Sequence, residues 1–197
     1  MKVGKDVDTD IRRVEAMHHA LPNVAFIGDS NQGLSYQECL AFADGVRRFS
    51  GRLLLLEQPV ERGNLESLAH IRRTTDIPVA ADESVRSLAD SRTVVEQHAA
   101  DYLNIKSMKT GVIEALEIAL FTLKAGLKLM IGGMIESCIA MGCSFSLVLG
   151  INGFDVLDLN TLLLLAADPV QGGYRYDGPM LQPWTGTGLD LSTIQPR

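Results

Sequence analysis

The chain has 197 residues, of which 46% are hydrophobic, and a formal net charge of −6 with a pI near 5.2. This length suffices for one domain, or for one domain and a fragment, with a substantial core. The acidic balance and the lack of any long run of like charges argue against nucleic acid as the main partner.

The cysteines and the apolar stretches indicate the compartment. Cys39, Cys138 and Cys143 show no paired spacing, which is typical of reduced thiols. No secretory signal opens the sequence, and the longest apolar stretch, 138–151, is interrupted by Ser and Gly and is too short to span a bilayer. We therefore expect a cytoplasmic protein that does not bind membranes.

Short apolar runs alternate with amphipathic segments along the chain. The runs predict strands at residues 1–4, 24–28, 53–57, 78–81, 102–106, 127–131 and 155–159. The amphipathic segments predict helices at 8–21, 35–51, 64–75, 87–97, 111–125 and 138–150. Asp8 or Thr9 and Ser35 are the expected caps of the first two helices. In the Gly/Pro-rich tail, 173–178 and 180–182 are expected to pair as a hairpin.

Strict alternation of strand and helix predicts an α/β fold with a parallel sheet and right-handed crossovers. Continuous apolar strands suit a sheet that is covered on both faces. A closed barrel of eight strands would need one strand more than this sequence supplies. We expect a TIM-type (β/α)7β barrel domain over residues 1–167, beginning at its second strand, with a tail, 168–197, that packs on it.

Charged residues recur at intervals of 24 to 28 residues, or twice that, and most of them close a short apolar run: Lys2, Asp29, Glu57, Asp82, Lys106 and Asp158. A strand, a helix and two loops occupy a similar length, roughly 30 residues. The spacing therefore predicts one charged side chain at the carboxyl end of each successive parallel strand. In a (β/α) barrel, that face holds the active site.

Three of these residues form a candidate metal site. Asp29, Glu57 and Asp82 offer hard oxygen ligands, which Mg²⁺ prefers together with water and substrate oxygens, and Mn²⁺ is the alternative ion. The four histidines are predicted on helices, so zinc is not expected. The competing interpretation is that strand-end acids cap the following helices. Three acids in register on consecutive strands favour the metal.

Two lysines flank the acids and are candidate bases. Lys2 and Lys106 are expected from strands that face each other across a barrel. A partly buried lysine beside a metal can act as a base, whereas the alternative is an exposed lysine at a strand end. The set suits proton abstraction next to a carboxylate. A metal stabilises the enediolate, one lysine removes the α-proton, and the other returns a proton on the opposite face.

Four segments carry a resemblance to a known family: 2–4 (KVG), 28–33 (GDSNQG), 56–59 (LEQP) and 81–84 (ADES). They resemble the end of a Lys-x-Lys motif and the three ligand loops in the barrel domain of the enolase superfamily, in its muconate-lactonizing-enzyme subgroup. The resemblance covers nearly the whole chain. It implies an isomerase in which Lys2 is catalytic and the three acids hold Mg²⁺, since lysine and Mg²⁺ act together on an ene-diolate in that superfamily.

Three further segments resemble dipeptide (L-Ala-D/L-Glu) epimerases of amino acid metabolism: 104–109 (NIKSMK), 133–137 (GMIES) and 158–161 (DLNT). The last lies where those enzymes carry an Asp-x-Asp that holds the substrate ammonium group, and here Asn160 replaces the second acid. The resemblance implies that Lys106 is the second base. It also implies substrate contacts from Met134, Glu136, Asp158 and Asn160, with support from Asn31, Glu83 and Lys109.

Complete members of that family carry an N-terminal α+β capping domain over the barrel mouth. The sequence shows neither this cap nor a first barrel strand, and open edges of a parallel sheet invite association. We therefore expect weak activity alone, and either a homo-oligomer or association with a chain that supplies the missing cap and strand. The ligand is expected to be a small-molecule carboxylate.

Three functions remain in competition. The first is an epimerase or racemase that acts on a dipeptide, because Asp158 favours a cationic group on the substrate. The second is muconate cycloisomerase or N-acylamino acid racemase chemistry on the same scaffold. The third, from a different class, is an inactive barrel fragment with a structural or assembly role. Retention of all three acids and both lysines argues against the third.

Overall fold

The structure is a computed structural model that describes residues 1–47, 53–168, 170–178, 180–183, 188–189 and 193–194. The chain divides into two units, Met1–Leu103 and Asn104–Arg197. Residues from 168 onward belong to the second unit. The predicted separation of a barrel from a tail stays a prediction.

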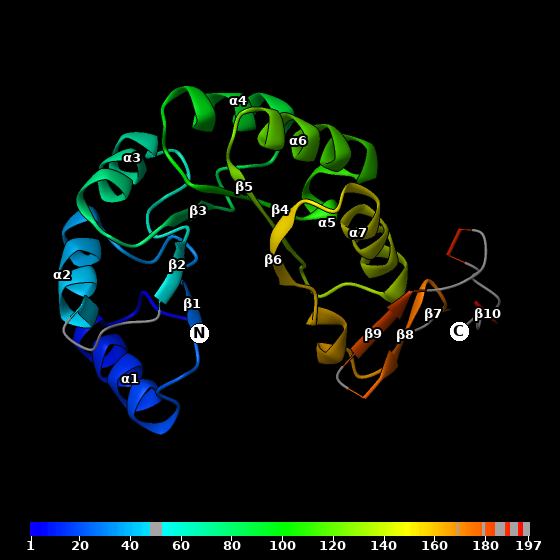
Figure 1. Ribbon diagram of the computed structural model, residues 1–197, viewed down its shortest axis with the longest axis horizontal. Coiled ribbons are helices and arrows are strands. Elements are labelled where there is room, and N and C mark those ends of the chain that lie inside the picture. Colours follow the sequence, from blue (N-terminus) through cyan, green and yellow to red (C-terminus); the bar gives the residue numbers. More distant parts are fainter. Residues whose placement is uncertain (48–52, 169, 179, 184–187, 190–192, 195–197) are drawn as a thin grey trace. The chain divides into compact units, whose positions relative to one another are not determined.

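The first unit alternates strands and helices: α1 (Val7–Ala20), β1 (Phe26–Asp29), α2 (Tyr36–Arg47), β2 (Leu53–Glu57), α3 (Leu65–Thr74), β3 (Val79–Ala81), α4 (Leu88–Glu96) and the start of β4 (Tyr102–Ile105). Pairing is parallel between β1 and β2, between β2 and β3, and between β3 and β4. Instead of the strand predicted over 1–4, Lys2 forms one isolated parallel bridge to Asp29. Figure 1 shows α1, α2 and α3 on one side of β1 and β2.

The core of this unit forms between the helices and the strands. Val14 of α1, Phe42 of α2 and Leu56 of β2 belong to one apolar cluster, and each is at most 1% exposed. A buried side chain of this size stabilises the fold by roughly 1.5–3 kcal/mol. Every residue of β3 and β4 is buried, as expected for strands covered on both faces.

The second unit contains α5 (Ser107–Thr110), α6 (Val112–Lys124), β5 (Lys128–Gly132), α7 (Cys138–Ile151), β6 (Phe154–Asp158) and the 3₁₀ helix η1 (Thr161–Leu164). The β5 and β6 strands are parallel, so the predicted parallel α/β class is confirmed in this unit as well. The predicted hairpin is also confirmed, since β8 (Tyr174–Asp177) pairs antiparallel with β9 (Met180–Pro183).

Several sequence predictions need correction or fall outside the described residues. Asp6, not Asp8 or Thr9, caps α1, because its side chain accepts a 2.7 Å hydrogen bond from Thr9 N. The short α5, η1 and the antiparallel pair β7 (Val170–Gln171) and β10 (Thr193–Ile194) were not predicted. The structure describes α2 as far as Arg47, and its predicted end near Gly51 lies outside the described residues.

Two further observations concern the cysteines and the helices. All three cysteines are free. Burial raises the pKa of the Cys39 thiol to about 12 and that of Cys138 to about 11, so neither is a ready thiolate at neutral pH. Within the described part of the chain, no helix has both the length and the apolar character needed to cross a bilayer.

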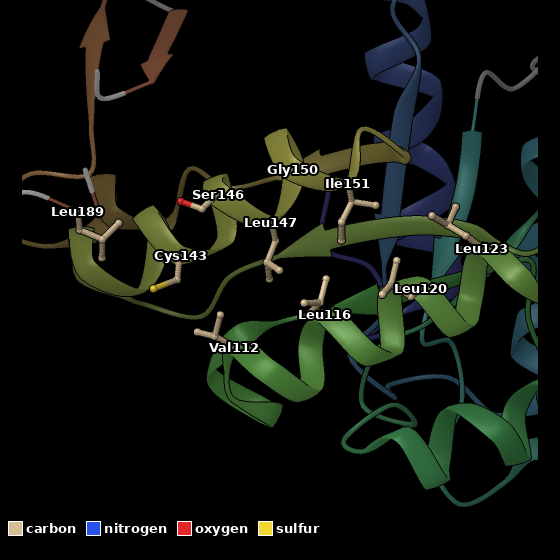
Figure 2. A pocket seen from close by; sticks show the side chains of 11 residues that line it. Val112, Leu116, Leu120, Leu123, Cys143, Ser146, Leu147, Gly150, Ile151 and Leu189 are labelled. Atoms are coloured by element: carbon tan, nitrogen blue, oxygen red, sulfur yellow. The ribbon is translucent and has the colours of Figure 1, made fainter. Parts of the chain in front are cut away.

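An apolar cavity of about 730 Å³ lies between α6 and α7 in the second unit (Figure 2). Leucines of α6, including Leu116 and Leu120, line one side, and Leu147 and Ile151 of α7 line the other. No charged side chain lines it, and the polar side chains among its lining residues are Cys143 and Ser146. It therefore lacks the acids and bases of the predicted chemistry.

Two glycines permit close backbone packing beside the β1 loop. Gly4 has a φ of +100°, which is costly for other residues. A Cβ on Gly33 would lie 2.5 Å from Gly4 O and 2.9 Å from Ser30 O, both of them backbone atoms. The segment around Lys2 and the loop after Asp29 can therefore touch only because both positions lack a side chain.

Replacing Gly33 with alanine should destabilise the chain by about 1–3 kcal/mol, as overpacking does. Gly150→Ala in α7 is the matched control. Its new Cβ meets nothing within 4 Å, and it should stabilise a helix interior by roughly 0.5–1 kcal/mol. Urea unfolding followed by circular dichroism measures both. If Gly33→Ala were as stable as the wild type, the segment around Lys2 and the loop after Asp29 could move apart without a loss of free energy.

Candidate active site

The register of the first three strands places acidic residues side by side. Asp29, the last residue of β1, is the Cα partner of Glu57, the last residue of β2. Glu57 in turn pairs with Ala80 of β3, and Asp82 follows two residues later. Side chains two residues apart on a strand share a face. Glu57 is 3% exposed and Asp82 is 2% exposed, so this unit holds two buried carboxylates at neighbouring strand ends.

Lys2 contacts Asp29, the first of these acids, directly. Its Nζ donates to Oδ2 of Asp29 and, at 2.6 Å, to Oδ1 of Asn31. The Asn31 side chain also donates to Oε1 of Glu83 at 3.3 Å. The structure thus brings together four residues that were predicted for one site, two of them in supporting roles.

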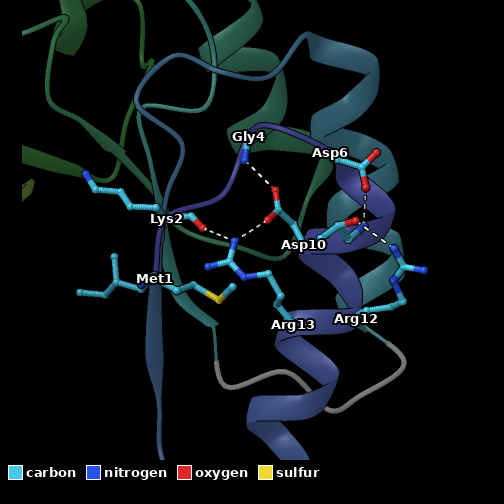
Figure 3. Close-up of polar contacts among 9 residues, drawn as sticks. Met1, Lys2, Gly4, Asp6, Asp10, Arg12 and Arg13 are labelled. Atoms are coloured by element: carbon cyan, nitrogen blue, oxygen red, sulfur yellow. Dashed lines mark hydrogen bonds and ion pairs between the residues drawn. The ribbon is translucent and has the colours of Figure 1, made fainter.

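A hydrogen-bond network around the buried Asp10 holds the backbone of Lys2 in place (Figure 3). Asp10 is 3% exposed, and its carboxylate accepts hydrogen bonds from Gly4 N at 2.7 Å and Arg13 Nη1 at 2.9 Å. The same Arg13 nitrogen donates to the carbonyl oxygen of Lys2 at 2.8 Å. Neither Asp10 nor Arg13 was predicted as a site residue from the sequence. An i, i+3 acid–base pair at a helix start was the available signal.

The acids fit a divalent ion by their chemistry but not as a preassembled cage. Among the described residues, no group of three or more His, Cys, Asp or Glu side chains is placed to hold a metal ion. The reason at Asp29 is visible, because its carboxylate binds the Lys2 ammonium. Three carboxylates at adjacent strand ends, two of them buried, are nevertheless the donor set that Mg²⁺ or Mn²⁺ prefers.

Gln58 is a residue of the candidate site that was not predicted from the sequence. It follows Glu57, is fully buried, and has a φ of +35°. Its side-chain oxygen accepts hydrogen bonds from the backbone N–H groups of Asp82 and Ser84. A polar residue between a buried acid and a proline was the available signal, but its partners could not be read from the sequence.

In the second unit, Lys106 follows β4 and lies close to the backbone of β5. A Cβ on Gly132 would lie 3.0 Å from Cε of Lys106 and 3.2 Å from the side-chain amide of Asn104. Gly132 therefore leaves the space that the lysine stem occupies. Lys109 Nζ donates to the carbonyl oxygen of Asn104 at 3.0 Å, so it supports the end of β4.

Glu136 is a buried acid near Lys106. It is 2% exposed, its Oε1 accepts a hydrogen bond from Met134 N at 2.8 Å, and its Oε2 has no hydrogen-bond partner within the described residues. Burial raises the pKa of this carboxyl, against the opposing effects of the Met134 hydrogen bond and the Lys106 charge. The structure thus places Met134 and Glu136 together.

The remaining predicted substrate contacts lie at the end of β6. Asp158 is the last residue of that strand, is the Cα partner of Gly132, and is exposed. Asn160 is also exposed, and its carbonyl oxygen accepts a hydrogen bond from Leu163 N at 3.0 Å. Gly132 therefore lies next to both Lys106 and Asp158. The Lys106 stem lies against its backbone, and Asp158 is its Cα partner on β6.

A parallel β/α domain with acids and lysines after its strands is the class that the fold and these residues define. The family model described as Enolase C-terminal domain-like matches residues 1–193. The chain belongs to this enolase C-terminal domain-like family, which confirms the resemblance seen in the motifs.

The chain is also similar to individual curated proteins. An aromatic dipeptide epimerase of Herpetosiphon aurantiacus is 40% identical over 191 residues, which cover 96% of this chain and 54% of that protein. An L-Ala-D/L-Glu epimerase of Thermotoga maritima is 37% identical over 92% of this chain and 53% of its own length. The chain thus spans about half the length of the curated relatives it matches.

Solved structures show the same fold. A mandelate racemase/muconate lactonizing protein from Herpetosiphon aurantiacus superposes with a TM-score of 0.92 at 37% identity, over 100% of this chain and 56% of that one. A dipeptide epimerase from Enterococcus faecalis, complexed with Mg and the dipeptide L-Leu-L-Tyr, gives a TM-score of 0.89 at 30% identity, over 95% of this chain and 54% of that one. The predicted barrel-type fold class is confirmed.

Replacing Glu136 with glutamine should change the pH dependence of stability. Since the folded-state pKa is raised above the ordinary value of 4.5, the wild type loses stability as pH rises through this window. Glutamine keeps an oxygen for Met134 N and does not ionise. The free energy of unfolding of Glu136→Gln, taken relative to that of the wild type, should therefore be larger at about pH 8 than at about pH 4. Urea unfolding at both pH values measures this difference.

Glu38→Gln supplies a control of opposite sign. The Ser35 hydrogen bonds lower the pKa of the Glu38 carboxyl, so its stabilising effect is present above the ordinary pKa and is lost as pH falls through the lowered one. This variant should lose stability relative to wild type at the higher pH. A Glu136→Gln effect that does not vary with pH would contradict the burial argument.

Proposed function

We propose that this chain supplies the catalytic residues of an isomerase, an epimerase or racemase that abstracts the proton α to a carboxylate. The observation that carries the proposal is that the Lys2 amine contacts the carboxylate of Asp29, whose neighbour at the adjacent strand end is Glu57. A base beside a carboxylate row suits abstraction of a weakly acidic α-proton.

In this proposal, Asp29, Glu57 and Asp82 hold Mg²⁺ or Mn²⁺. When bound, the ion supplies positive charge that stabilises the enediolate. That a similar epimerase structure contains Mg supports the assignment. For Lys2 to act as a base, its amine must leave Asp29 and be neutral. Binding of a cation by Asp29 would favour both changes, because a positive charge nearby disfavours the ammonium form.

The chain offers two lysines for a reaction that inverts a carbon centre. Lys2 removes the α-proton of one enantiomer in this proposal, and Lys106 delivers a proton to the opposite face. In the reverse direction, the two residues exchange these tasks. The space left by Gly132 allows the Lys106 stem to approach the end of its strand.

The proposed substrate is a dipeptide. Curated relatives named as dipeptide epimerases support this class, as does the exposed acid Asp158, which suits a substrate ammonium group. Met134 and Glu136 are proposed to contact the substrate beside Lys106. Because Asn160 is uncharged, less negative charge surrounds the ammonium group than an Asp-x-Asp would supply.

The partner proposed for this chain is a polypeptide segment that corresponds to the half of its relatives that the chain does not match. Its relatives are about twice as long as the matched region, which supports this view. Association with another copy is the alternative. Either one would cover exposed apolar residues such as Leu157 of β6, which is 54% exposed.

Solvent exchange tests the reaction itself. The chain is incubated with Mg²⁺ and L,L-dipeptides in D₂O, and α-deuterium is followed by NMR. Incorporation at one residue of the dipeptide, absent in Glu57→Gln, is the expected result. Turnover of muconate or an N-acylamino acid without any dipeptide exchange would move the assignment to those reactions. A folded, Mg²⁺-binding chain without exchange on any of them would favour a structural role.

Single lysine variants test the division of labour. Lys106→Ala should reduce epimerisation by roughly 10²- to 10⁴-fold, the range for loss of a general base. It should leave α-proton exchange of the enantiomer served by Lys2 much less affected. Lys2→Ala should show the reverse preference. Measuring exchange and inversion separately for L- and D-centred dipeptides distinguishes these outcomes, and intact epimerisation in Lys106→Ala would rule out the two-base mechanism.

A further inference from the structure

Gln58 joins the three loops that carry the acids. Its backbone N–H donates to Ala80 O at 2.9 Å, and its carbonyl oxygen accepts from Gln32 N at 2.8 Å. The first bond ties it to β3 and the second to the loop after β1. The backbone carbonyl oxygen of its immediate neighbour, Glu57, accepts a hydrogen bond from Ser30 N at 3.0 Å. One buried residue therefore contacts the segments that follow Asp29 and precede Asp82.

The Gln58 side chain uses its full hydrogen-bonding capacity. Oε1 accepts from Asp82 N at 2.9 Å and from Ser84 N at 3.1 Å. Nε2 donates to Val60 O at 3.0 Å and to Ser84 Oγ at 2.8 Å, and Ser84 Oγ donates to Arg62 O at 2.8 Å. A carboxamide offers two donors and two acceptor sites. The partners also fix which atom is oxygen, because a flipped amide would oppose N–H groups with N–H groups.

The backbone of Gln58 is held in a costly conformation. A φ of +35° is uncommon for a residue with a side chain, and the following Pro59 further disfavours helical backbone angles at this position. Conformations of this kind persist where the surroundings impose them, and they cluster at functional sites. Here the strain allows backbone and side chain to reach different loops at once.

We propose that Gln58 is a positioning residue that sets the geometry of the Asp29, Glu57 and Asp82 carboxylates for a divalent ion. This inference rests on the proposed function, in which these acids hold the metal. The reason is mechanical. Oε1 fixes the peptide N–H of Asp82, which sets the direction in which that carboxylate points, and Glu57 is bonded to Gln58 directly. Residues that orient ligands in this way typically change metal affinity by 10- to 100-fold when they are replaced.

The test measures the Mg²⁺ dissociation constant of the full 197-residue chain by calorimetry, so that no substrate or turnover is involved. Gln58→Met keeps the length of the side chain and removes all four hydrogen bonds, and it should weaken binding by about 10- to 100-fold. Ser84→Ala removes one acceptor of Nε2 and leaves Oε1 bonded. It should weaken binding by about 2- to 10-fold, the equivalent of one hydrogen bond.

Val94→Ala is the control for general loss of stability. Val94 is a fully buried residue of α4, and no hydrogen bond of its side chain reaches the carboxylate loops, because a valine side chain makes none. It should lower the unfolding midpoint while keeping the Mg²⁺ dissociation constant within about twofold of wild type, since a core cavity costs stability rather than ligand geometry. Circular dichroism confirms that each variant is folded before titration.

Each outcome decides the proposal. Wild-type affinity in folded Gln58→Met overturns it, as does equal weakening by Val94→Ala. If Gln58→Met does not fold, Ser84→Ala decides, and unchanged affinity there overturns the proposal. A folded wild type that binds no Mg²⁺ overturns both this inference and the metal of the proposed function. Intact Mg²⁺ binding that depends on Gln58, without α-proton exchange, overturns the proposed reaction alone.

Discussion

Parallel strand pairing places acid beside acid in this chain, and much of the surrounding structure follows from that constraint. Asp29 and Glu57 are Cα partners at the ends of β1 and β2, and Asp82 follows the next strand. Like charges at short range repel each other, and burial of a charge adds to the cost. Positive charge nearby offsets it, and in the first unit Lys2 supplies some of that charge to Asp29. The Lys2 side chain is 69% exposed, so water screens the pair and its contribution to stability is small.

This weak pairing suits a base better than a strong ion pair would. A lysine bound tightly in a buried pair would stay protonated, whereas an exposed one can exchange its partner when the local charge changes. The surrounding backbone is by contrast firmly held. Asp10 and Arg13 fix the Lys2 main chain, and Gly4 and Gly33 allow it to lie against the β1 loop. The structure thus combines a hydrogen-bonded Lys2 main chain with a Lys2 side chain that is largely exposed to water.

The sequence alone was sufficient to predict the main alternation of strands and helices from β1 to β6 and the acids at the strand ends, because both depend on local patterns. The four leucines before Glu57 are a continuous apolar run, and strands form there and at Tyr102–Ile105, where they were expected. Competing local caps were harder to separate, since Asp6, Asp8 and Thr9 all favour a helix start and only the hydrogen bond to Thr9 N identifies Asp6. Pairing of β7 with β10 joins residues far apart in sequence, and no local pattern signals it.

In the candidate site, too, some residues could be predicted from the sequence and others could not. Residue types after strands predicted Asp29, Glu57, Asp82 and Lys106, but not the groups that hold them. The role of Gln58 depends on a positive φ and on partners from two other loops, and both arise only in the folded chain. Likewise, nothing in the sequence around Gly132 shows that the Lys106 side chain packs against its backbone.

The competing explanation for the strand-end acids was that they cap the helices that follow, and the observed caps argue against it. Asn64 caps α3 through Ser67 N, and Ser87 caps α4 through Asp90 N. Ser35 and Glu38 exchange hydrogen bonds at the start of α2, as in a capping box.

The helices of the first unit therefore take their caps from residues several positions beyond each acid. Asp29 instead accepts from Asn31 N and from Lys2, and the peptide N–H of Asp82 is bound by Gln58. Evolution of a stable fold alone has no need for buried acids at Glu57 and Asp82, because burying a charge costs more than an apolar residue of similar size. Since helix capping does not require these acids and stability disfavours them, the binding of a cationic ligand is the physical role that best accounts for their position.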